Sequence, residues 1–176
     1  MRLPEAKLAA VAKNVLEMMA FTFEKPGDYP GPCADAVRAR VGFRGPCEGW
    51  VEVTTSRAVI GGLAANMLGQ DDGEPPGEQQ QLDALGELAN IICGNLVQEF
   101  GGPAAVFNLT APQMQAGPPP SVEAALETVT RVKIPLEEGW LEATLVVTTP
   151  VPAPSAASAP DDACACAAAA AGGSQP

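Results

Sequence analysis

Apolar residues near the start of the chain follow the spacing of a helix. Between Glu5 and about Phe21 they recur every three or four positions. This pattern predicts an amphipathic helix with one buried face. The face consists of Leu8, Val11, Val15, Met18 and Met19. Residues 24–32 contain three prolines and two glycines, so they are expected to end the helix and turn the chain.

The spacing then changes to the alternation that is typical of strands. Residues 37–43 and 50–55 alternate apolar and polar side chains, with a turn-like Arg-Gly-Pro-Cys sequence at 44–47 between them. These two runs predict a β-hairpin. A second helix is expected over residues 58–68, with Ser56 near its start, although Gly61 and Gly62 lower the helix propensity of this segment. Its apolar side would hold Val59, Leu63 and Met67.

A third and longer helix is predicted from residue 78 to residue 100. Only Gly86 and Gly94 interrupt this run, and Gly-Gly-Pro at 101–103 is a stop signal. Three β-like runs follow, at 104–110, 128–135 and 140–149, and a turn at 136–139 joins the last two. The order α-β-β-α-α-β-β-β indicates an α+β domain in which helices pack on a mostly antiparallel sheet.

The composition changes after Pro150. Residues 150–176 are mainly Pro, Ala, Ser and Gly, and we expect a disordered tail after a folded domain at 1–149. The tail contains Cys164 and Cys166, which amount to half a zinc site at most. The five cysteines are odd in number and irregularly spaced, which favours free thiols over a disulfide framework.

Charge and composition restrict the classes of function. The formal net charge of -11 disfavours binding to nucleic acids and anionic membranes. The chain has no histidine, which excludes histidine-based nucleophile triads, His-ligated metals and the commonest general acid or base near neutral pH. No apolar run approaches the roughly 20 residues that span a bilayer, and no signal peptide is recognisable. We therefore expect a soluble cytoplasmic protein.

The third predicted helix carries a polar stripe. At about 100° per residue, Asp83, Glu87, Asn90 and Gly94 fall within about 60° of one another. The opposite side is apolar and suits a core-facing surface. It consists of Leu85, Leu88, Ala89, Ile92 and Leu96. We therefore expect Glu87 and Asn90 to be exposed and to make few contacts within the domain.

An amphipathic helix needs a polar face in any case, and this requirement alone accounts for Asp and Glu at these positions. Two residues argue for more than that. Asn90 is a poor choice for a helix interior, and Gly94 costs about 1 kcal/mol relative to alanine while removing bulk from the same face. The pattern favours close approach by another surface.

Residues 83–95, Asp-Ala-Leu-Gly-Glu-Leu-Ala-Asn-Ile-Ile-Cys-Gly-Asn, resemble the Asp-x-x-x-Glu-x-x-Asn signature of the CheC/CheX/FliY chemotaxis phosphatase family. The likeness is sharp over about 15 residues and looser across residues 1–149. It includes a first helix similar to Val-Leu-Glu-Met-Met-Ala-Phe at 15–21. The family fold is an α+β domain with a comparable order of elements.

The resemblance implies a protein aspartyl-phosphate phosphatase acting on a phosphorylated CheY-like response regulator. Glu87 and Asn90 would then be the catalytic pair, with Asn90 orienting a water and Glu87 pairing with a lysine of the regulator. Asp83 and Gly94 would belong to the partner-binding face. Such an enzyme needs no metal site or cofactor of its own, because the regulator supplies the Mg²⁺.

Members like CheC carry a second motif on the first helix. Here the corresponding segment is Glu-Met-Met-Ala at 17–20, with Ala20 in place of the second asparagine. One motif is closer to CheX, whose members are homodimers joined through sheet edges. The alternatives that remain are a module that binds a receiver domain without catalysis and a structural domain that matches the motif by accident.

Overall fold

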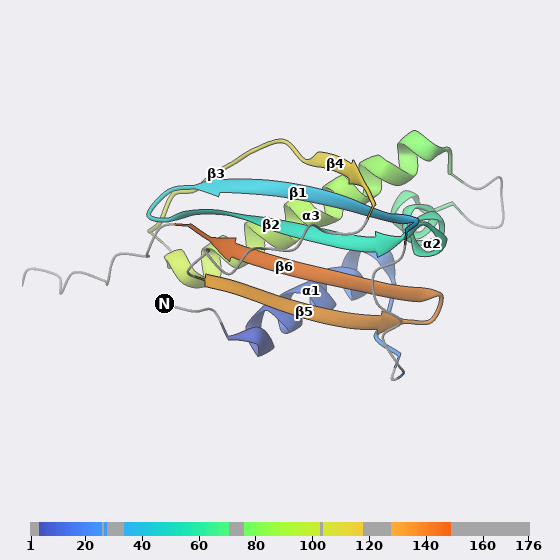
Figure 1. Ribbon diagram of the computed structural model, residues 1–176, viewed down its shortest axis with the longest axis horizontal. Helices are drawn as coiled ribbons and strands as arrows, with labels where there is room; N and C mark the ends of the chain where they lie inside the picture. The colour runs from blue at the N-terminus through green and yellow to red at the C-terminus, as the bar shows by residue number, and fades with distance from the viewer. Residues whose placement is uncertain are drawn as a thin grey trace, which may run out of the picture.

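The computed structural model describes residues 4–25, 27, 34–70, 76–102, 104–117 and 128–148. Three helices pack on one face of an antiparallel sheet, which confirms the predicted α+β class (Figure 1). The helices are α1 (Glu5–Ala20), α2 (Arg57–Leu68) and α3 (Glu78–Gly101). The strands are β1 (Ala36–Arg44), β2 (Glu48–Ser56), β3 (Asn108–Leu109), β4 (Gln113–Ala116), β5 (Thr128–Leu136) and β6 (Gly139–Val147).

Two long hairpins form the sheet. β1 pairs with β2, β5 pairs with β6, and β2 joins the hairpins by pairing with β6, so the strand order is β3-β1-β2-β6-β5. The short β4 also pairs with β1, beyond β3. Every strand pair is antiparallel. The first hairpin confirms the predicted alternation and extends it by one or two residues at each end.

The hydrophobic core lies between the sheet and the helices. Helix α3 covers β1 and β2, and helix α1 covers β5 and β6 (Figure 1). Alternate strand residues point to the helices because successive side chains lie on opposite faces of a strand. This inner face holds Val37, Ala39, Val41, Val51, Val53, Leu141, Ala143 and Leu145, all buried. As the sequence indicates, the core is mainly aliphatic.

The opposite face of the sheet is polar, and it holds a buried ion cluster. Glu52 Oε2 accepts hydrogen bonds from Arg40 Nε at 3.0 Å and Nη2 at 2.7 Å. The same oxygen lies 3.7 Å from Nη1 of Arg38, an ion pair too long to be a hydrogen bond. Arg38 is only 7% exposed, and its Nε and Nη1 have no hydrogen-bond partner among the residues that the structure describes. Arg40 also lies over the Trp50 ring, 5.1 Å from its centroid.

The segment after α3 differs from the prediction. The sequence suggests one strand over residues 104–110, but only Asn108–Leu109 pairs with β1. The chain first passes the end of α3, where Phe107 makes an edge-on contact with Phe43, 6.1 Å between ring centroids. The sequence pattern also missed β4, because Gln-Met-Gln-Ala has weak strand propensity and its pairing depends on the free edge of β1.

Some sequence predictions concern residues outside the described ranges. The tail at 150–176, including Cys164 and Cys166, lies there, and so does Cys33. Cys47 and Cys93 are free, buried thiols, as expected. None of the helices in the described ranges is long and apolar enough to cross a membrane.

Candidate active site on helix α3

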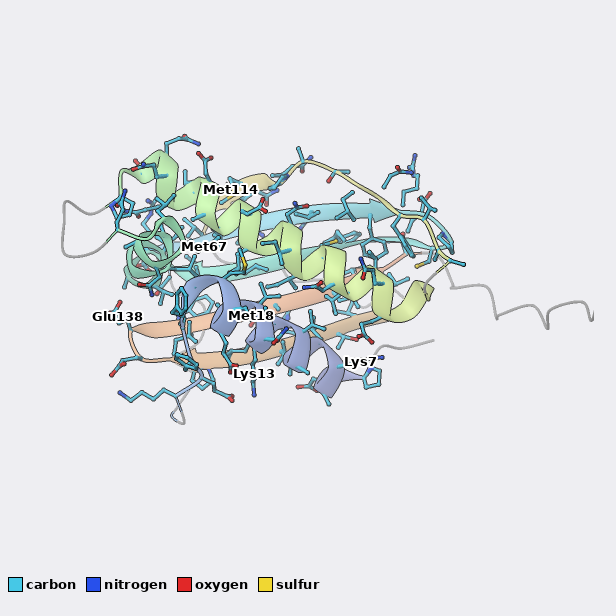
Figure 2. The ribbon with its side chains drawn as sticks, turned by 180° about the vertical axis from the view of Figure 1, so that it is seen from behind. Lys7, Lys13, Met18, Met67, Met114 and Glu138 are labelled. Carbon is cyan, nitrogen blue, oxygen red and sulfur yellow. The ribbon has the colours of Figure 1, made fainter. Side chains whose placement is uncertain are left out.

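Helix α3 presents the polar stripe to solvent and the apolar side to the sheet. The predicted core-facing residues Leu85, Leu88, Ala89, Ile92 and Leu96 are all completely buried. Asp83 and Glu87 are exposed, whereas Asn90 and Gly94 are half-buried. The predicted stripe is therefore present on one face, and its exposure decreases from Asp83 towards Gly94. Figure 2 views the molecule from the side on which α1, α2 and α3 cover the sheet.

The two candidate catalytic side chains have no partner among the described residues. Asp83 Oδ1 accepts a hydrogen bond from Gln79 Nε2 at 2.8 Å, one helical turn earlier. Neither the Glu87 carboxylate nor the Asn90 amide has a side-chain hydrogen bond or an ion pair with any residue of the described ranges. Asp83 is thus held locally, while Glu87 and Asn90 are free to interact with a second molecule.

The segment that contains β3 and β4 runs along one side of the stripe. Gly86 is buried, and a Cβ built there would lie 3.2 Å from Pro112 Cβ and 3.9 Å from Met114 Sδ. At Gly94 the nearest atom to such a Cβ is Leu109 Cδ1, at 3.9 Å. The close approach that the sequence suggested on this helix therefore occurs at Gly86, and its partner is this chain's own Pro112. At Gly94 there is only ordinary van der Waals contact.

Asn90 lies between these two glycines. Gly86 is four residues before it and Gly94 four residues after it, so all three share one ridge of the helix. The helix itself therefore places no side chain at the i−4 and i+4 positions of Asn90, although Glu87 flanks it at i−3 and Pro112 packs over Gly86. Sequence reasoning missed the role of Gly86, which it treated only as an interruption. The sequence does contain a signal for this role, because glycines stand four residues before and four residues after the central asparagine.

Helix α1 lies along the other side of α3. Lys7 and Glu99 form an ion pair near the start of α1 and the end of α3. Next to this pair, a shallow pocket is shared by Val11 and Asn14 of α1 and Asn95, Gln98 and Glu99 of α3. The two helices are therefore antiparallel neighbours, and the stripe lies between α1 and the β3–β4 segment.

The thiol on α3 is not suited to nucleophilic catalysis. Cys93 is completely buried, and burial raises its pKa to about 12, so it is a neutral thiol at pH 7. Burial also raises the pKa of Cys47. Within the described ranges no three His, Cys, Asp or Glu side chains are grouped so that they could hold a metal ion.

The arrangement of charges and amides limits the chemistry that α3 can perform. An exposed carboxylate can pair with a cation of another molecule, and an amide one turn away can accept from and donate to water or an oxyanion. The Glu87 carboxylate is exposed to solvent, and the Asn90 amide is half-buried on the same outer face of the helix, less exposed than the sequence predicted. They are therefore placed to enter the site of another macromolecule.

Comparisons with known families agree with this description. The family model described as "Chemotaxis phosphatase CheX" matches residues 37–137, a range that includes all but the first residue of β1 and the whole of β2, α2 and α3. None of the curated protein sequences matches the chain.

Solved structures share the fold at low sequence identity. CheX from Desulfovibrio desulfuricans is 22% identical with a TM-score of 0.63, over 82% of this chain and 99% of that one. CheX from Vibrio vulnificus is 20% identical with a TM-score of 0.62, over 84% of this chain and 98% of that one. The CheX chain of a CheX–CheY–BeF3–Mg²⁺ complex from Borrelia burgdorferi is 17% identical with a TM-score of 0.58, over 84% of this chain and all of that one.

Proposed function

Because this chain belongs to the CheX family of chemotaxis phosphatases, we propose that it binds a phosphorylated CheY-like response regulator and hydrolyses the aspartyl phosphate. The observation that carries the proposal is the state of Glu87 and Asn90. They lie one turn apart on the outward face of α3, and neither side chain is used within the described part of the domain. Such a pair is available for insertion into the regulator's phosphorylation site.

Asn90 would position the nucleophile. Its side-chain oxygen accepts a hydrogen bond from a water molecule, and its NH₂ group donates to a phosphoryl oxygen. The water attacks phosphorus in line with the bond to the aspartyl oxygen, and that bond breaks to give inorganic phosphate and a free aspartate. Positioning alone contributes a large part of such a rate enhancement, because a water held in line has already lost the translational and rotational freedom that the reaction would otherwise cost.

Glu87 would fix the orientation of the complex. Its carboxylate pairs with a lysine at the regulator's active site, and the attraction between these opposite charges fixes the register of the two proteins. The regulator's acidic residues hold the Mg²⁺ that stabilises the charge on the phosphoryl group, so no cofactor of this chain is required. The Borrelia CheX–CheY complex, which contains BeF3 and Mg²⁺, supports this division of roles by analogy.

The lack of histidine is compatible with this reaction. The leaving group is a carboxylate, whose conjugate acid has a pKa of about 4, so it departs without protonation by a general acid. A loose phosphoryl-transfer transition state also needs little help from a strong base. Alignment by an amide and charge pairing by a carboxylate are sufficient roles for this helix.

The competing function is binding without hydrolysis. A module that only captures a receiver domain would use the same exposed face of α3, so the Glu87 and Asn90 geometry is equally suited to it. Measuring whether the phosphoryl group is hydrolysed separates the two functions.

By the same family resemblance we propose a cytoplasmic homodimer joined through a sheet edge.

The proposed activity is tested with purified CheY-like receiver domains phosphorylated by acetyl phosphate. Substoichiometric wild-type protein should accelerate loss of the phosphoryl group well above the receiver's own rate. Glu87→Ala should weaken both docking and turnover, because it loses the charged contact. A wild-type protein that binds the receivers and leaves their phosphate lifetime unchanged would establish the binding module instead.

A further inference from the structure

A receiver domain needs a wider contact surface than one stripe of α3. Stable complexes bury about 800 Å² on each partner, with apolar anchors near the centre and polar groups around them. The stripe itself offers two carboxylates, an amide and a glycine, and no apolar anchor. The rest of the contact must come from the elements beside α3, and α1 presents the larger apolar side chains on that face.

The antiparallel packing of the helices places Met18 near Asn90. The Lys7–Glu99 ion pair aligns one end of α1 with the far end of α3, and Asn14 shares a pocket with Asn95. Each helix rises 1.5 Å per residue, so four residues forward from Asn14 corresponds to four or five residues back from Asn95. That brings Met18 level with residues 90–91. Figure 2 shows Met18 on the same helical side of the molecule as α3.

Met18 and Phe21 are unusually exposed for their size. Met18, which the sequence pattern wrongly placed on the buried face, is 68% exposed, and Phe21 is 69% exposed. Met18 follows Asn14 by four residues, so these two share one face of α1, and Phe21 is the C-cap residue directly after the helix. Scattered apolar residues on a surface need no explanation, but adjacent large ones beside a candidate catalytic pair indicate an interaction site.

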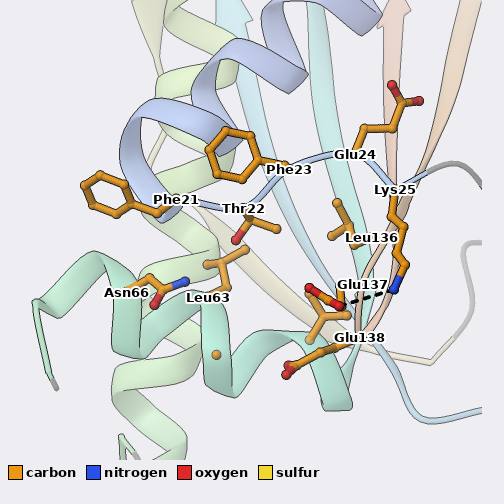
Figure 3. Close-up of a pocket in the computed structure, with 12 residues that line it drawn as sticks. Phe21, Thr22, Phe23, Glu24, Lys25, Leu63, Asn66, Leu136, Glu137 and Glu138 are labelled. Atoms are coloured by element: carbon orange, nitrogen blue, oxygen red, sulfur yellow. Dashed lines mark hydrogen bonds and ion pairs between the residues drawn. The ribbon is translucent and has the colours of Figure 1, made fainter. Parts of the chain in front are cut away.

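The backbone holds Phe21 in an uncommon conformation. Its φ of 47° and ψ of 33° place it in the left-handed region, which is unfavourable for a bulky residue. Two hydrogen bonds to Ala20 O fix the end of α1, from Asn66 Nδ2 of α2 at 2.8 Å and from Thr22 Oγ1 at 2.9 Å. Figure 3 shows the Phe21 ring at the end of α1, on the side away from Lys25 and Glu137. Strain that keeps an aromatic ring in solvent favours a role in binding.

We propose that Met18 of α1 and Phe21 at its C-cap form the apolar half of the surface that docks the response regulator, beside Glu87 and Asn90 of α3. This inference rests on the proposed function. The occupant is a receiver domain that presents an apolar patch next to the lysine and Mg²⁺ site that Glu87 and Asn90 enter.

Charge argues against a second copy of this chain on the same face. Asp83 and Glu87 on α3 and Glu17 on α1 are all exposed near this surface. A two-fold contact through it would set the same carboxylates against one another in a chain of net charge -11. A partner with a cationic centre has the complementary charge.

The test measures binding and turnover separately. Binding uses receiver domains charged with beryllofluoride and Mg²⁺, which do not turn over, and activity uses the same domains charged with acetyl phosphate. Met18→Gln keeps the length and helix propensity of the side chain but removes its apolar end. Phe21→Asn replaces the ring with a residue that tolerates the left-handed conformation. Phe23→Ala is the control, because Phe23 is 62% exposed and lines the same pocket as Phe21, but its neighbour Glu24 bridges to Leu136 on the β5 side.

We expect Met18→Gln and Phe21→Asn each to weaken binding by about tenfold, as loss of an interface anchor does. The turnover number at saturating receiver should stay at the wild-type value, since neither side chain reaches the phosphoryl group. Phe21→Asn should also leave the melting temperature unchanged or raised, which excludes unfolding as the cause. Phe23→Ala should bind as the wild type does.

The outcomes distinguish this inference from the proposed function. Wild-type affinity in both α1 variants, with an active wild-type protein, would overturn the docking role of α1 and leave the function standing. Equal losses in all three variants would also overturn it, because the effect would not be specific to the face beside α3. A wild-type protein that binds no receiver would overturn the proposed function and the docking surface with it.

Discussion

At the scale of single residues, two glycines lower the stability of α3 on either side of the candidate catalytic Asn90. Glycine is among the least favourable residues in a helix interior, yet Gly86 and Gly94 occupy the turns before and after Asn90. Gly86 has a structural reason, since Pro112 would be 3.2 Å from an added Cβ. A Cβ at Gly94 would meet no close neighbour, so packing does not require glycine there. We propose that Gly94 keeps the surface next to Asn90 open for a partner.

Replacing Gly94 with alanine should therefore affect stability and function in opposite directions. The new methyl group would meet only Leu109 at ordinary contact distance, and the helix would gain up to about 1 kcal/mol in the free energy of unfolding. Thermal denaturation should show a Tm raised by a few degrees. Receiver binding or turnover should fall, because the methyl group narrows the face beside Asn90. Gly94→Ala that loses stability would show that the packing against Leu109 is tighter than described.

At the scale of elements, the sheet depends on an ion cluster on its helix-free face. Glu52 of β2 is the shared acceptor for Arg40 and the ion partner of the buried Arg38, both on β1. Removing the carboxylate would leave two adjacent cations, of which Arg38 is buried and has N–H groups without a hydrogen-bond partner in the described part of the chain. Leaving a buried charge without its partner lowers the free energy of unfolding several times more than losing an exposed ion pair does.

We predict that Glu52→Ala lowers the free energy of unfolding by about 3 kcal/mol. Glu137→Ala provides the control, because Glu137 also pairs with a cation, Lys25, but both side chains are well exposed. That change should cost less than about 1 kcal/mol. Urea denaturation of the two variants measures the difference. Similar small losses in both would mean that the Arg38–Glu52–Arg40 cluster contributes little to the sheet.

The elements with strong periodicity could be predicted from the sequence. The apolar positions of α3 and the first hairpin follow the periods of 3.6 and 2 that burial on one face imposes, so their buried sides were correctly assigned. In α1 the prediction was correct for Leu8 and Val15 but wrong for Met18 and Met19, which are exposed because Ala12, Leu16 and Ala20 complete the buried face instead. β4 could not be found in this way, because Gln113–Ala116 pairs through backbone groups with an available edge rather than through an apolar face.

The candidate site was predictable to a similar extent. The stripe from Asp83 to Gly94 follows from helical spacing alone. The contacts of Gly86 with Pro112, and the alignment of Met18 with the stripe, depend on how α3 packs against the β3–β4 segment and against α1. Packing between segments far apart in the sequence leaves no periodic signal within either one.

At the scale of the whole molecule, the described elements contain a complete hydrophobic core. Among the described residues, the buried apolar side chains come from all three helices, from the four long strands and from Cys47 in the turn of the first hairpin. The composition of residues 150–176 offers no apolar periodicity that could add to it. We therefore propose that residues 1–149 form the functional domain by themselves.

A chain truncated after Thr149 should keep the melting temperature of the full chain to within about two degrees, because the deleted residues are expected to bury little apolar surface. Its affinity for beryllofluoride-charged receiver domains should also be unchanged. Calorimetry and the binding assay check both statements. A markedly lower melting temperature would show that the tail packs on the domain.

Single-turnover hydrolysis by Asn90→Ala tests the proposal that Asn90 aligns water while the rest of the face holds the receiver. Phosphorylated receiver is mixed with excess protein, and loss of the phosphoryl group is followed for the wild type and the variant. Binding to the beryllofluoride-charged receiver is measured in parallel. We expect binding within a few-fold of the wild type and a rate lower by about 100-fold or more. An unchanged rate in Asn90→Ala, with an active wild type, would contradict it.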